Sequence, residues 1–494
     1  MKNENMKRLV LMGLMGLMVL VGKEVSGQMV TLTKGNEGKT MDDEDVKSAR
    51  FLGNDGDRFC WLMKEDDRDN DWSVFALDRD LNVRGHLSLP VDKEYKVVAL
   101  IKNGPLANVV MVDSSRAKRT TVVQFSIDMD SLSLVDNKID TVKNFEMAKG
   151  DRCIVWGATS EDGEFLGLLT VYQMTSKKQY SAVAMMYDRE MNELWTREFP
   201  LGTTECVAVS NEGELVTLGH EREGASEHFD VAVLNARSGD SYRMTVNSER
   251  VNDMQIVNVQ NRKVYCAGVF SPKESDPEDN LVGGTAMLVF DLDSTCVTGF
   301  TLCPFQNEDV NILLNKKTKK VQKEKIVPMV TVLAGAGTAD GCVLAVGHRH
   351  TLRYMNANGS VTTSYYAQGL QLVAVNEKAE VKWVRNLRRN DMVYGSDELL
   401  YVSLFTEGDS VFLMKMESPK YPTEYDIAKE AKEYELGDKG NLVLYSVTEE
   451  GEVHKTILEQ KTKHMLISSA RSDDGNILML TLNGRKSRMV EMSF

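Results

Sequence analysis

The sequence predicts an all-β fold, a single β-propeller of eight four-stranded blades, with seven blades as the alternative count. Three observations support this prediction. Short runs rich in Val, Leu, Ile and aromatic residues alternate with tight polar turns along the 494 residues. The pattern recurs about every 45 to 85 residues, which is the scale of a repeat array. No long helical pattern separates the runs, and four-stranded units without intervening helices are typical of propellers.

The first hairpin of each repeat contains a turn with Gly, Asn or Asp, because tight hairpin turns require positive φ. These turns are NDGD at 54–57, KNGP at 102–105, KGDR at 149–152, NEGE at 211–214, QNRK at 260–263, ADGC at 339–342, EGDS at 407–410 and DDGN at 473–476. A second hairpin follows each of the first seven. Most of its first strands end at an Asp or Asn, which we expect to cap the next turn.

The repeats divide the chain into a signal peptide and one propeller domain. We predict a signal peptide over 1–27 and the propeller over 28–494, with blades at approximately 46–89, 95–140, 142–199, 203–246, 254–302, 327–387, 398–458 and 464–494. The last unit supplies only three strands. We therefore expect MVTLT at 29–33 to pair with the strand at 488–494, complete the last blade and close the ring.

The N-terminus has the three-part pattern of a secretory signal peptide: a basic start, the apolar run at 9–22 and small residues before Gly27. This run is short for a membrane span, so we expect cleavage after Gly27, with an uncleaved membrane anchor as the alternative. The mature chain is then expected to be exported (periplasmic, cell-surface or secreted), without a membrane span, and monomeric.

Composition narrows the classes of partner and cofactor. The formal net charge is −14 and no basic surface dominates, so we predict no nucleic-acid partner. The seven cysteines form no CxxC motif, and most lie inside apolar runs, which is typical of buried thiols rather than of zinc ligands or disulfides. We predict no cofactor and no bound metal.

Two of the expected closing strands, YDREMNELW at 187–195 and NEKAEVKW at 376–383, resemble the repeat of pyrroloquinoline-quinone-type propellers. The resemblance covers these two blades only, and it implies that Trp195 and Trp383 act as wedges between neighbouring blades. It does not extend to the cofactor, because the chain has no adjacent Cys pair of the kind those quinone dehydrogenases carry. The resemblance therefore implies a fold and no chemistry.

The long connections of the predicted propeller fall on one face. In an antiparallel blade, the connection between strands two and three shares a face with the link to the next blade. The expected long connections are 161–179, 272–284, 351–369, 419–440 with a short helix at 425–436, and the link with the Lys-rich run at 315–325. Long loops on a rigid scaffold usually carry binding. The Lys-rich run is either a solvated charge run or a contact for an anionic partner.

Histidines and tyrosines on this face are the candidate binding residues. His348 and His350 lie two residues apart in one expected strand, so their side chains share a face and could hold a metal ion or contact a ligand. His220 has the corresponding position in a distant blade, too far away to share an ion, which favours ligand contact. Tyr354, Tyr365 and Tyr366 either stack on a sugar or peptide or pack their loop against the disc.

No GxSxG, HExxH, P-loop or dinucleotide fingerprint is present. We therefore predict a non-catalytic exported propeller that binds a protein or glycan through the face with the long connections. The alternative is a polysaccharide-acting hydrolase or lyase whose carboxylates converge on the propeller axis. Residues contributed by different blades would leave no local motif.

Overall fold

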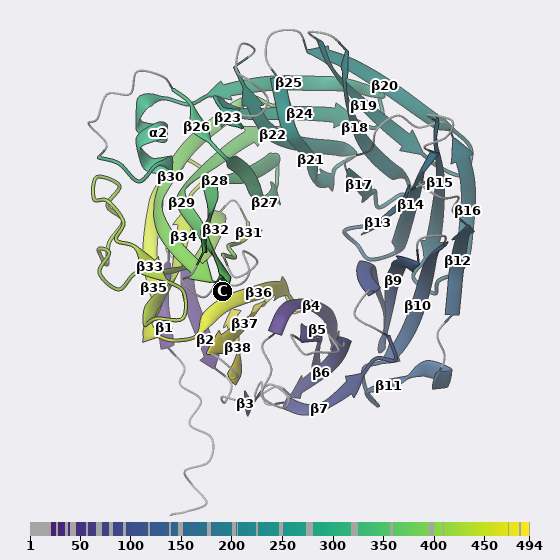
Figure 1. Cartoon of the computed structure of the whole chain (residues 1–494), viewed down its shortest axis with the longest axis horizontal. Coiled ribbons are helices and arrows are strands. Elements are labelled where there is room, and N and C mark those ends of the chain that lie inside the picture. Colours follow the sequence, from purple (N-terminus) through teal and green to yellow (C-terminus); the bar gives the residue numbers. More distant parts are fainter. Residues whose placement is uncertain are drawn as a thin grey trace, which may run out of the picture.

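In the computed structural model, almost the whole described chain is β structure arranged around a central opening (Figure 1). The structure describes residues 21–25, 28–34, 38–39, 46–55, 58–65, 72–78, 83–91, 95–116, 119–137, 140–146, 152–174, 179–199, 204, 206–223, 226–246, 250–272, 280–317, 325–355, 359–394, 400–408, 410–472, 474–483 and 486–493. Its α-helix, α2 (Asn307–Leu313), is seven residues long. No helix in these ranges is long and apolar enough to cross a lipid bilayer.

The described residues form eight sheets with four or more strands, which we number one to eight beginning with the sheet that contains β4. Sheet one contains β4 (Val46–Asp55), β5 (Arg58–Glu65), β6 (Trp72–Asp78) and β7 (Val83–Ser88). Sheet two contains β8 (Tyr95–Asn103), β9 (Leu106–Arg116), β10 (Arg119–Asp128), β11 (Ser133–Leu134) and β12 (Asp140–Glu146). Sheet three contains β13 (Arg152–Thr159), β14 (Phe165–Met174), β15 (Gln179–Asp188) and β16 (Glu193–Phe199). Sheet four contains β17 (Cys206–Val209), β18 (Leu215–Glu223), β19 (Ser226–Leu234) and β20 (Gly239–Val246).

The remaining four sheets follow in chain order and include the longest strands. Sheet five contains β21 (Arg250–Gln260), β22 (Lys263–Ser271), β24 (Gly284–Asp291) and β25 (Cys296–Pro304), and beside it β23 (Leu281–Val282) pairs with β26 (Val327–Pro328). Sheet six contains β27 (Val330–Thr338), β28 (Gly341–Met355), β29 (Val361–Asn376), β30 (Val381–Tyr394) and β33 (Tyr434–Glu435). Sheet seven contains β31 (Ser403–Glu407), β32 (Ser410–Glu417), β34 (Gly440–Val447) and β35 (Val453–Thr462). Sheet eight contains β36 (Met465–Arg471), β37 (Ile477–Asn483), β38 (Lys486–Ser493), β1 (Val21–Val25), β2 (Gln28–Lys34) and β3 (Gly38–Lys39).

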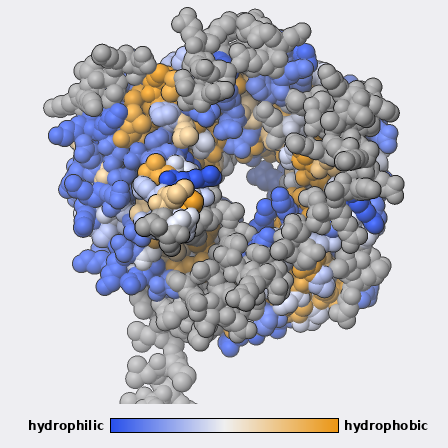
Figure 2. Space-filling view, viewed as in Figure 1, coloured by the Kyte–Doolittle hydropathy of each residue, from blue (hydrophilic) through white to orange (hydrophobic). Residues whose placement is uncertain are grey.

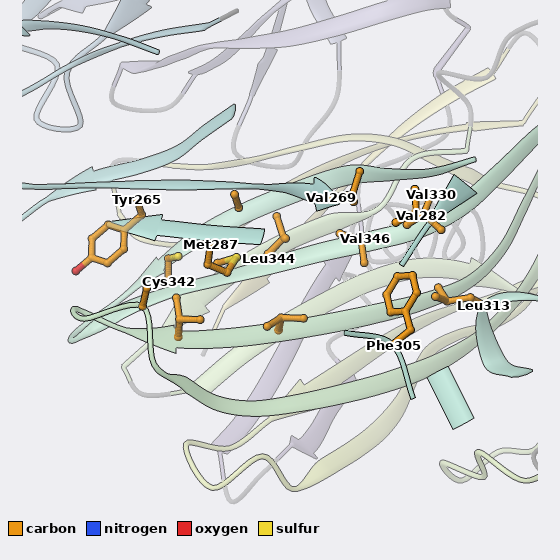
Figure 3. Packing of buried hydrophobic residues seen from close by; sticks show 14 of the residues in the cluster. Tyr265, Val269, Val282, Met287, Phe305, Leu313, Val330, Cys342, Leu344 and Val346 are labelled. Carbon is orange, nitrogen blue, oxygen red and sulfur yellow. The ribbon is translucent and has the colours of Figure 1, made fainter. Parts of the chain in front are cut away.

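Apolar side chains join each sheet to the next. In the cluster between sheets five and six, Tyr265 and Cys342 lie at one end, and Val282 and Val330 lie at the other (Figure 3). The cluster between sheets six and seven contains Trp383, which is buried as a wedge between blades would be. Trp195 packs, partly buried, against the cluster between sheets three and four. Both tryptophans thus lie where the sequence resemblance implied.

The last sheet packs on the first and takes a strand from the N-terminal part of the chain. Trp61 and Phe75 of sheet one share a cluster with Leu480 of sheet eight. β2 pairs antiparallel with β38, from Thr31 opposite Ser493 to Lys34 opposite Val490, which is the pairing expected from the sequence. β1 continues the sheet beyond β2, upstream of the predicted cleavage site, and the apolar run at 9–20 lies outside the described residues.

The third repeat differs from its predicted layout. The stretch 161–179 was expected to be a loop, but its residues Phe165–Met174 form β14, the second strand of sheet three. The predicted third unit began at 142, whereas β12 (Asp140–Glu146) pairs with β10 and belongs to sheet two. Of the KGDR motif only Arg152 is described, and it begins β13, the first strand of sheet three. The real hairpin turn is SEDGE at 160–164, in which the N–H of Gly163 donates to the carbonyl of Ser160.

The described residues of the stretch 351–369 are also mostly strand rather than loop. β28 and β29 stay paired from Gly341 opposite Asn376 to Met355 opposite Val361, and β30 follows β29 outward as far as Tyr394. β27 begins only at Val330, opposite His348. Sheet six therefore carries a three-stranded extension, which we call the arm: residues 349–355, 361–368 and 389–394.

The short helix expected at 425–436 is absent, and long-range contacts explain the difference. Tyr425 donates its hydroxyl to the backbone carbonyl of Asn386 at 2.7 Å. The carbonyl of Ile427 accepts from Arg388 Nε at 2.9 Å, and the carbonyl of Ala431 accepts from Asn315 Nδ2 at 2.9 Å. These bonds hold the segment against β30 and the residues after α2 in a non-helical path, so tertiary contacts override the local helical pattern.

The helix that does form, α2, lies in the link between sheets five and six and was not predicted. Its Asp309 accepts from Asn386 Nδ2 of β30 at 2.7 Å. Its C-terminal turn lies against Gly369 of β29, where a Cβ atom would meet Leu313 Cα at 2.3 Å and Ile312 O at 2.5 Å. Gly369 has a φ of +57°, so both its backbone conformation and its close approach to α2 favour glycine.

Deleting residues 28–34 should lower the free energy of unfolding by about 3 kcal/mol, because it removes the strand that pairs with β38 and exposes the edge of that strand. The exposed edge should also promote association, since unpaired strand edges join other chains. Thermal unfolding and light scattering measure both effects. A variant that lacks only residues 1–27 is the matched control. An unchanged unfolding midpoint for the deletion of 28–34 would contradict a structural role for β2.

The substitution Gly369→Ala should lower the free energy of unfolding by about 3 kcal/mol, through positive φ and through overlap with the α2 backbone. Gly359 has a φ of +81° and open space around its Cβ position, so Gly359→Ala should cost only about 1 kcal/mol. Denaturant unfolding of the two variants separates packing from backbone strain. Equal losses would show that α2 does not press on Gly369.

Candidate functional site

A cavity of about 420 Å³ opens between sheets five and six on the face that carries the connection from β22 to β24 and the arm. It is formed where the strands of several sheets begin or end at this face. Its lining comes from the start of β21, the end of β22, residues 280–282, the start of β27, residues 349–351 and 365–366 of the arm, and Leu400. Val282 and Val330 belong both to this lining and to the apolar cluster beneath it (Figure 3).

The polar lining of the cavity is more basic than acidic. Arg250 and Arg349 contribute guanidinium groups, and Asp253 is the single carboxylate among the described lining residues. The paired carboxylates that a glycoside hydrolase requires are therefore not provided by the described part of this cavity. Asn252 donates its side-chain amide to Ser271 Oγ at 2.7 Å across the cavity wall. The cavity thus combines an apolar floor with cationic and amide groups at its sides.

The arm extends this surface away from the disc and exposes apolar side chains. Met355 is 79% exposed, Val361 is 59% exposed and Tyr354 is 49% exposed. Leu352 and Tyr394 are exposed as well. Met355 and Val361 pair on one face of the arm, and Leu352, Tyr354 and Tyr394 lie on the other. Exposed apolar residues gathered on one short extension commonly mark an interaction site. The space-filling view shows the central opening with hydrophobic areas on its rim (Figure 2).

The arm and His348 at its base bring together five of the six residues that the sequence singled out, and three of them line the cavity. The rings of His350 and Tyr366 stack with centroids 4.7 Å apart and planes at 3°. Tyr365 also lines the cavity and packs against the core between sheets seven and eight. His348 lies behind His350, with ring centroids 5.2 Å apart, and is buried. Tyr354 lies farther out on the arm.

His220 belongs to sheet four and does not reach the cavity. Its ring stacks on Phe229, with centroids 5.0 Å apart. Within the described ranges, no group of three or more His, Cys, Asp or Glu side chains could hold a metal ion. His348 and His350 form a stacked pair, of which His350 lines the cavity.

Burial keeps the stacked histidines neutral. Desolvation and the neighbouring His350 ring lower the pKa of His348 from its usual 6.5 to about 4, against the opposing effect of a hydrogen bond with Gln368. Desolvation also lowers the pKa of His350. Burial and a hydrogen bond with Tyr354 raise the pKa of Tyr366. At neutral pH, this part of the site is an uncharged aromatic surface.

Sequence reasoning missed the basic and amide residues of the cavity. Arg250 and Asn252 begin β21, Ser271 ends β22, and Arg349 stands between the two histidines. The available signal was positional, because polar residues at the beginnings and ends of strands lie on the face where long connections gather. Arg349 also donates from its side chain to the carbonyl of Leu400 at 3.3 Å, which links the arm to sheet seven.

A buried polar network supports the arm from the side of α2. Arg388 donates to the carbonyls of Asn311 and Ile427, and Arg389 pairs with Asp391 at 2.5 Å. Arg389 also donates to the carbonyl of Leu400 at 3.0 Å. These contacts join β30 to α2, to the segment after β32 and to the start of sheet seven. The base of the arm is therefore a braced part of the fold.

Comparison with known proteins gives likeness of structure only. No protein-family model matches the sequence, and no curated protein matches it. The β-propeller domain of the Trilobed protease from Pyrococcus furiosus is similar over 85% of this chain and 98% of that chain, with 10% identity and a TM-score of 0.36. The Pyrococcus horikoshii acylaminoacyl peptidase is similar over 89% of this chain and 57% of that chain, with 8% identity and a TM-score of 0.38. An uncharacterised Listeria monocytogenes protein is similar over 80% of this chain and 94% of that chain, with 11% identity and a TM-score of 0.37.

The neutral, buried state of His348 should make stability depend on pH. The unfolded chain binds a proton at His348 below pH 6.5, whereas the folded chain binds one only near pH 4, so the free energy of unfolding falls as pH drops through that window. The loss should be on the order of 3 kcal/mol at the acidic end.

Denaturant unfolding of the wild type and His348→Gln between these pH values isolates the effect, because the stability difference between the two proteins should shrink as pH falls. His454 is exposed on β35, so His454→Gln is the matched control. A difference between wild type and His348→Gln that does not change with pH would contradict the assignment.

Proposed function

We propose that this chain is an exported eight-bladed β-propeller, completed by β2, that binds a protein partner through the cavity and the arm. The single observation that carries the proposal is the arm itself: three paired strands hold apolar side chains in solvent directly beside a cavity with an apolar floor. A strand that contributes only to the fold would end where the rest of its sheet ends. The extra length places Tyr354, Met355 and Val361 where they stabilise no core.

The chemistry of the surface favours a protein over a glycan. Sugars stack on open aromatic faces, but one face of the Tyr366 ring is covered by His350. The remaining exposed groups include Leu, Met and Val, which protein interfaces bury and which offer a sugar few hydrogen bonds. The braced base of the arm supports the same proposal, since a preorganised surface loses less entropy on binding.

The proposed blade count depends on how the sheets pack on one another. Eight successive sheets, each joined to the next by an apolar cluster and the last joined to the first, support eight blades rather than seven. Export is proposed on the N-terminal pattern of residues 1–27.

Site-specific photo-crosslinking in cells that produce the protein tests the binding surface. A benzophenone amino acid replaces Tyr354 in one variant and Leu194 of β16 in the other. These positions are matched, because they are 49% and 47% exposed, but only the first lies on the arm. We expect a discrete protein adduct from position 354 and little from position 194. Equal labelling at the two positions, or no protein adduct at 354, would contradict a protein partner at the arm.

A further inference from the structure

Along the arm, the outer edge of β28 has no strand partner among the described residues. β27 pairs with β28 only as far as His348, and the backbone N–H of Arg349 donates to the carbonyl of Met329 at 3.0 Å. Beyond Arg349, no strand of the described chain pairs with this edge, whereas the other edge stays paired with β29 as far as Met355. This edge begins at the cavity, because Arg349, His350 and Thr351 all line it.

The direction of the backbone groups along this edge follows from the pairing. In an antiparallel sheet, successive residues direct their N–H and C=O groups toward opposite edges. Arg349 points its N–H outward to Met329, and no register shift interrupts β28 between His348 and Met355. Thr351 and Arg353 therefore direct their N–H and C=O groups to the open edge. An extended chain laid beside β28 would meet a donor and an acceptor at each of them.

The two faces of β28 offer an added strand different neighbours. Side chains alternate between faces, so His350, Leu352 and Tyr354 form an aromatic and apolar row on one face. Arg349, Thr351 and Arg353 form a row on the other face that carries two guanidinium groups, with Arg250 nearby in the cavity wall. A strand added beside this edge matches β28 best when it carries apolar side chains on the face of His350, Leu352 and Tyr354 and carboxylates on the opposite face.

We propose that the open edge of β28 binds an extended segment of a partner protein by strand addition, and that this segment alternates acidic with apolar residues. The inference rests on the proposed function and specifies the partner that the surface accepts. Main-chain hydrogen bonds to Thr351 and Arg353 provide affinity, and the alternating rows provide specificity. An apolar side chain at one end of the segment enters the cavity beside the His350 and Tyr366 rings.

Charge argues against a second copy of this chain as the occupant. Two β28 edges paired antiparallel would place Arg353 opposite Arg353 or opposite Arg349, and like charges directly opposite each other destabilise a sheet. The whole chain also carries a net charge of −14, so two copies repel. The arginines of this edge are a local exception to the negative net charge of the chain and suit an acidic segment.

Fluorescence anisotropy with a labelled peptide of about nine residues, in which Glu alternates with Leu or Tyr, tests the proposal. We expect saturable binding that weakens as salt is raised. A peptide of the same composition with its Glu residues grouped at one end should bind about tenfold more weakly, and so should the alternating peptide N-methylated at every second residue. Failure of the alternating peptide to bind, or equal binding of the N-methylated peptide, would overturn strand addition.

Protein variants locate the binding to the edge. Thr351→Pro removes an outward N–H and should weaken binding about tenfold, while Thr351→Ala keeps the N–H and should stay within about twofold. Arg353→Glu should weaken binding about fivefold, and the matched control Arg237→Glu, on a turn of sheet four, should not. Thermal unfolding shows whether Thr351→Pro folds, and the N-methylated peptide tests the same hydrogen bonds on the wild-type protein.

The outcomes separate the two proposals. If photo-crosslinking at 354 captures a partner but neither Thr351→Pro nor N-methylation affects peptide binding, the arm binds proteins by another mode and strand addition is wrong. If the wild type dimerises and Thr351→Pro abolishes the dimer, the occupant of the edge is a second copy and the proposed partner is wrong.

Discussion

Face-to-face packing of neighbouring sheets is the interaction on which the rest of this structure depends. A four-stranded sheet alone exposes both faces and two edges, so it gains stability only when neighbours cover its faces. Here each sheet shares an apolar cluster with the one before it and the one after it, and Trp61 of the first sheet packs with Leu480 of the last. Because neighbouring described sheets cover each other's faces, these sheets gain a core without a separate helical layer. Outer edges and connecting segments can then vary without loss of the core.

The connecting segments differ in length and structure from one sheet to the next. Between sheets five and six the chain adds α2, and after β32 it adds a segment without regular structure, and both are bonded to β30. Asn386 illustrates the arrangement: its amide donates to Asp309 of α2, while its carbonyl accepts from Tyr425. Gly369 lets α2 approach the backbone of β29 directly. The additions brace the base of the arm from the side of β30, and no strand in the described ranges pairs with its opposite edge beyond Arg349. An extension of three strands with exposed apolar residues would be poorly ordered without such support.

The sequence predicted the repeat well because the residues that form a tight turn are adjacent in the chain. The prediction failed where the structure depends on contacts between residues far apart in the chain. Glycine turns located most hairpins, and the unfilled place in the last unit located the strand that pairs with β38. The third unit was misplaced although its turn SEDGE at 160–164 matches SNEGE at 210–214 and TEEGE at 448–452, each with the same Gly N–H to Ser or Thr carbonyl bond. This turn motif therefore marks the first hairpin of the third unit. The absent helix at 425–436 had no such signal, because Ala431 bonds to Asn315, 116 residues away. His350, Tyr365 and Tyr366 were found from residue type, while the cavity arginines needed the fold.

The proposed site depends on which backbone N–H and C=O groups have a hydrogen-bonding partner in a neighbouring strand and which do not. Within the sheets, strand pairing uses the hydrogen-bonding groups of the chain, and a protein avoids leaving a long strand edge open because such edges recruit other chains. On the arm, β28 extends beyond the end of β27, and its edge lies next to a cavity with an apolar floor. Natural edges are commonly protected by charge, and Arg349 and Arg353 give this edge a positive row on a chain whose net charge is −14. The same charge that discourages pairing between copies makes the edge selective for an acidic strand. Protection from self-association and recognition of a partner are therefore two consequences of one arrangement of residues.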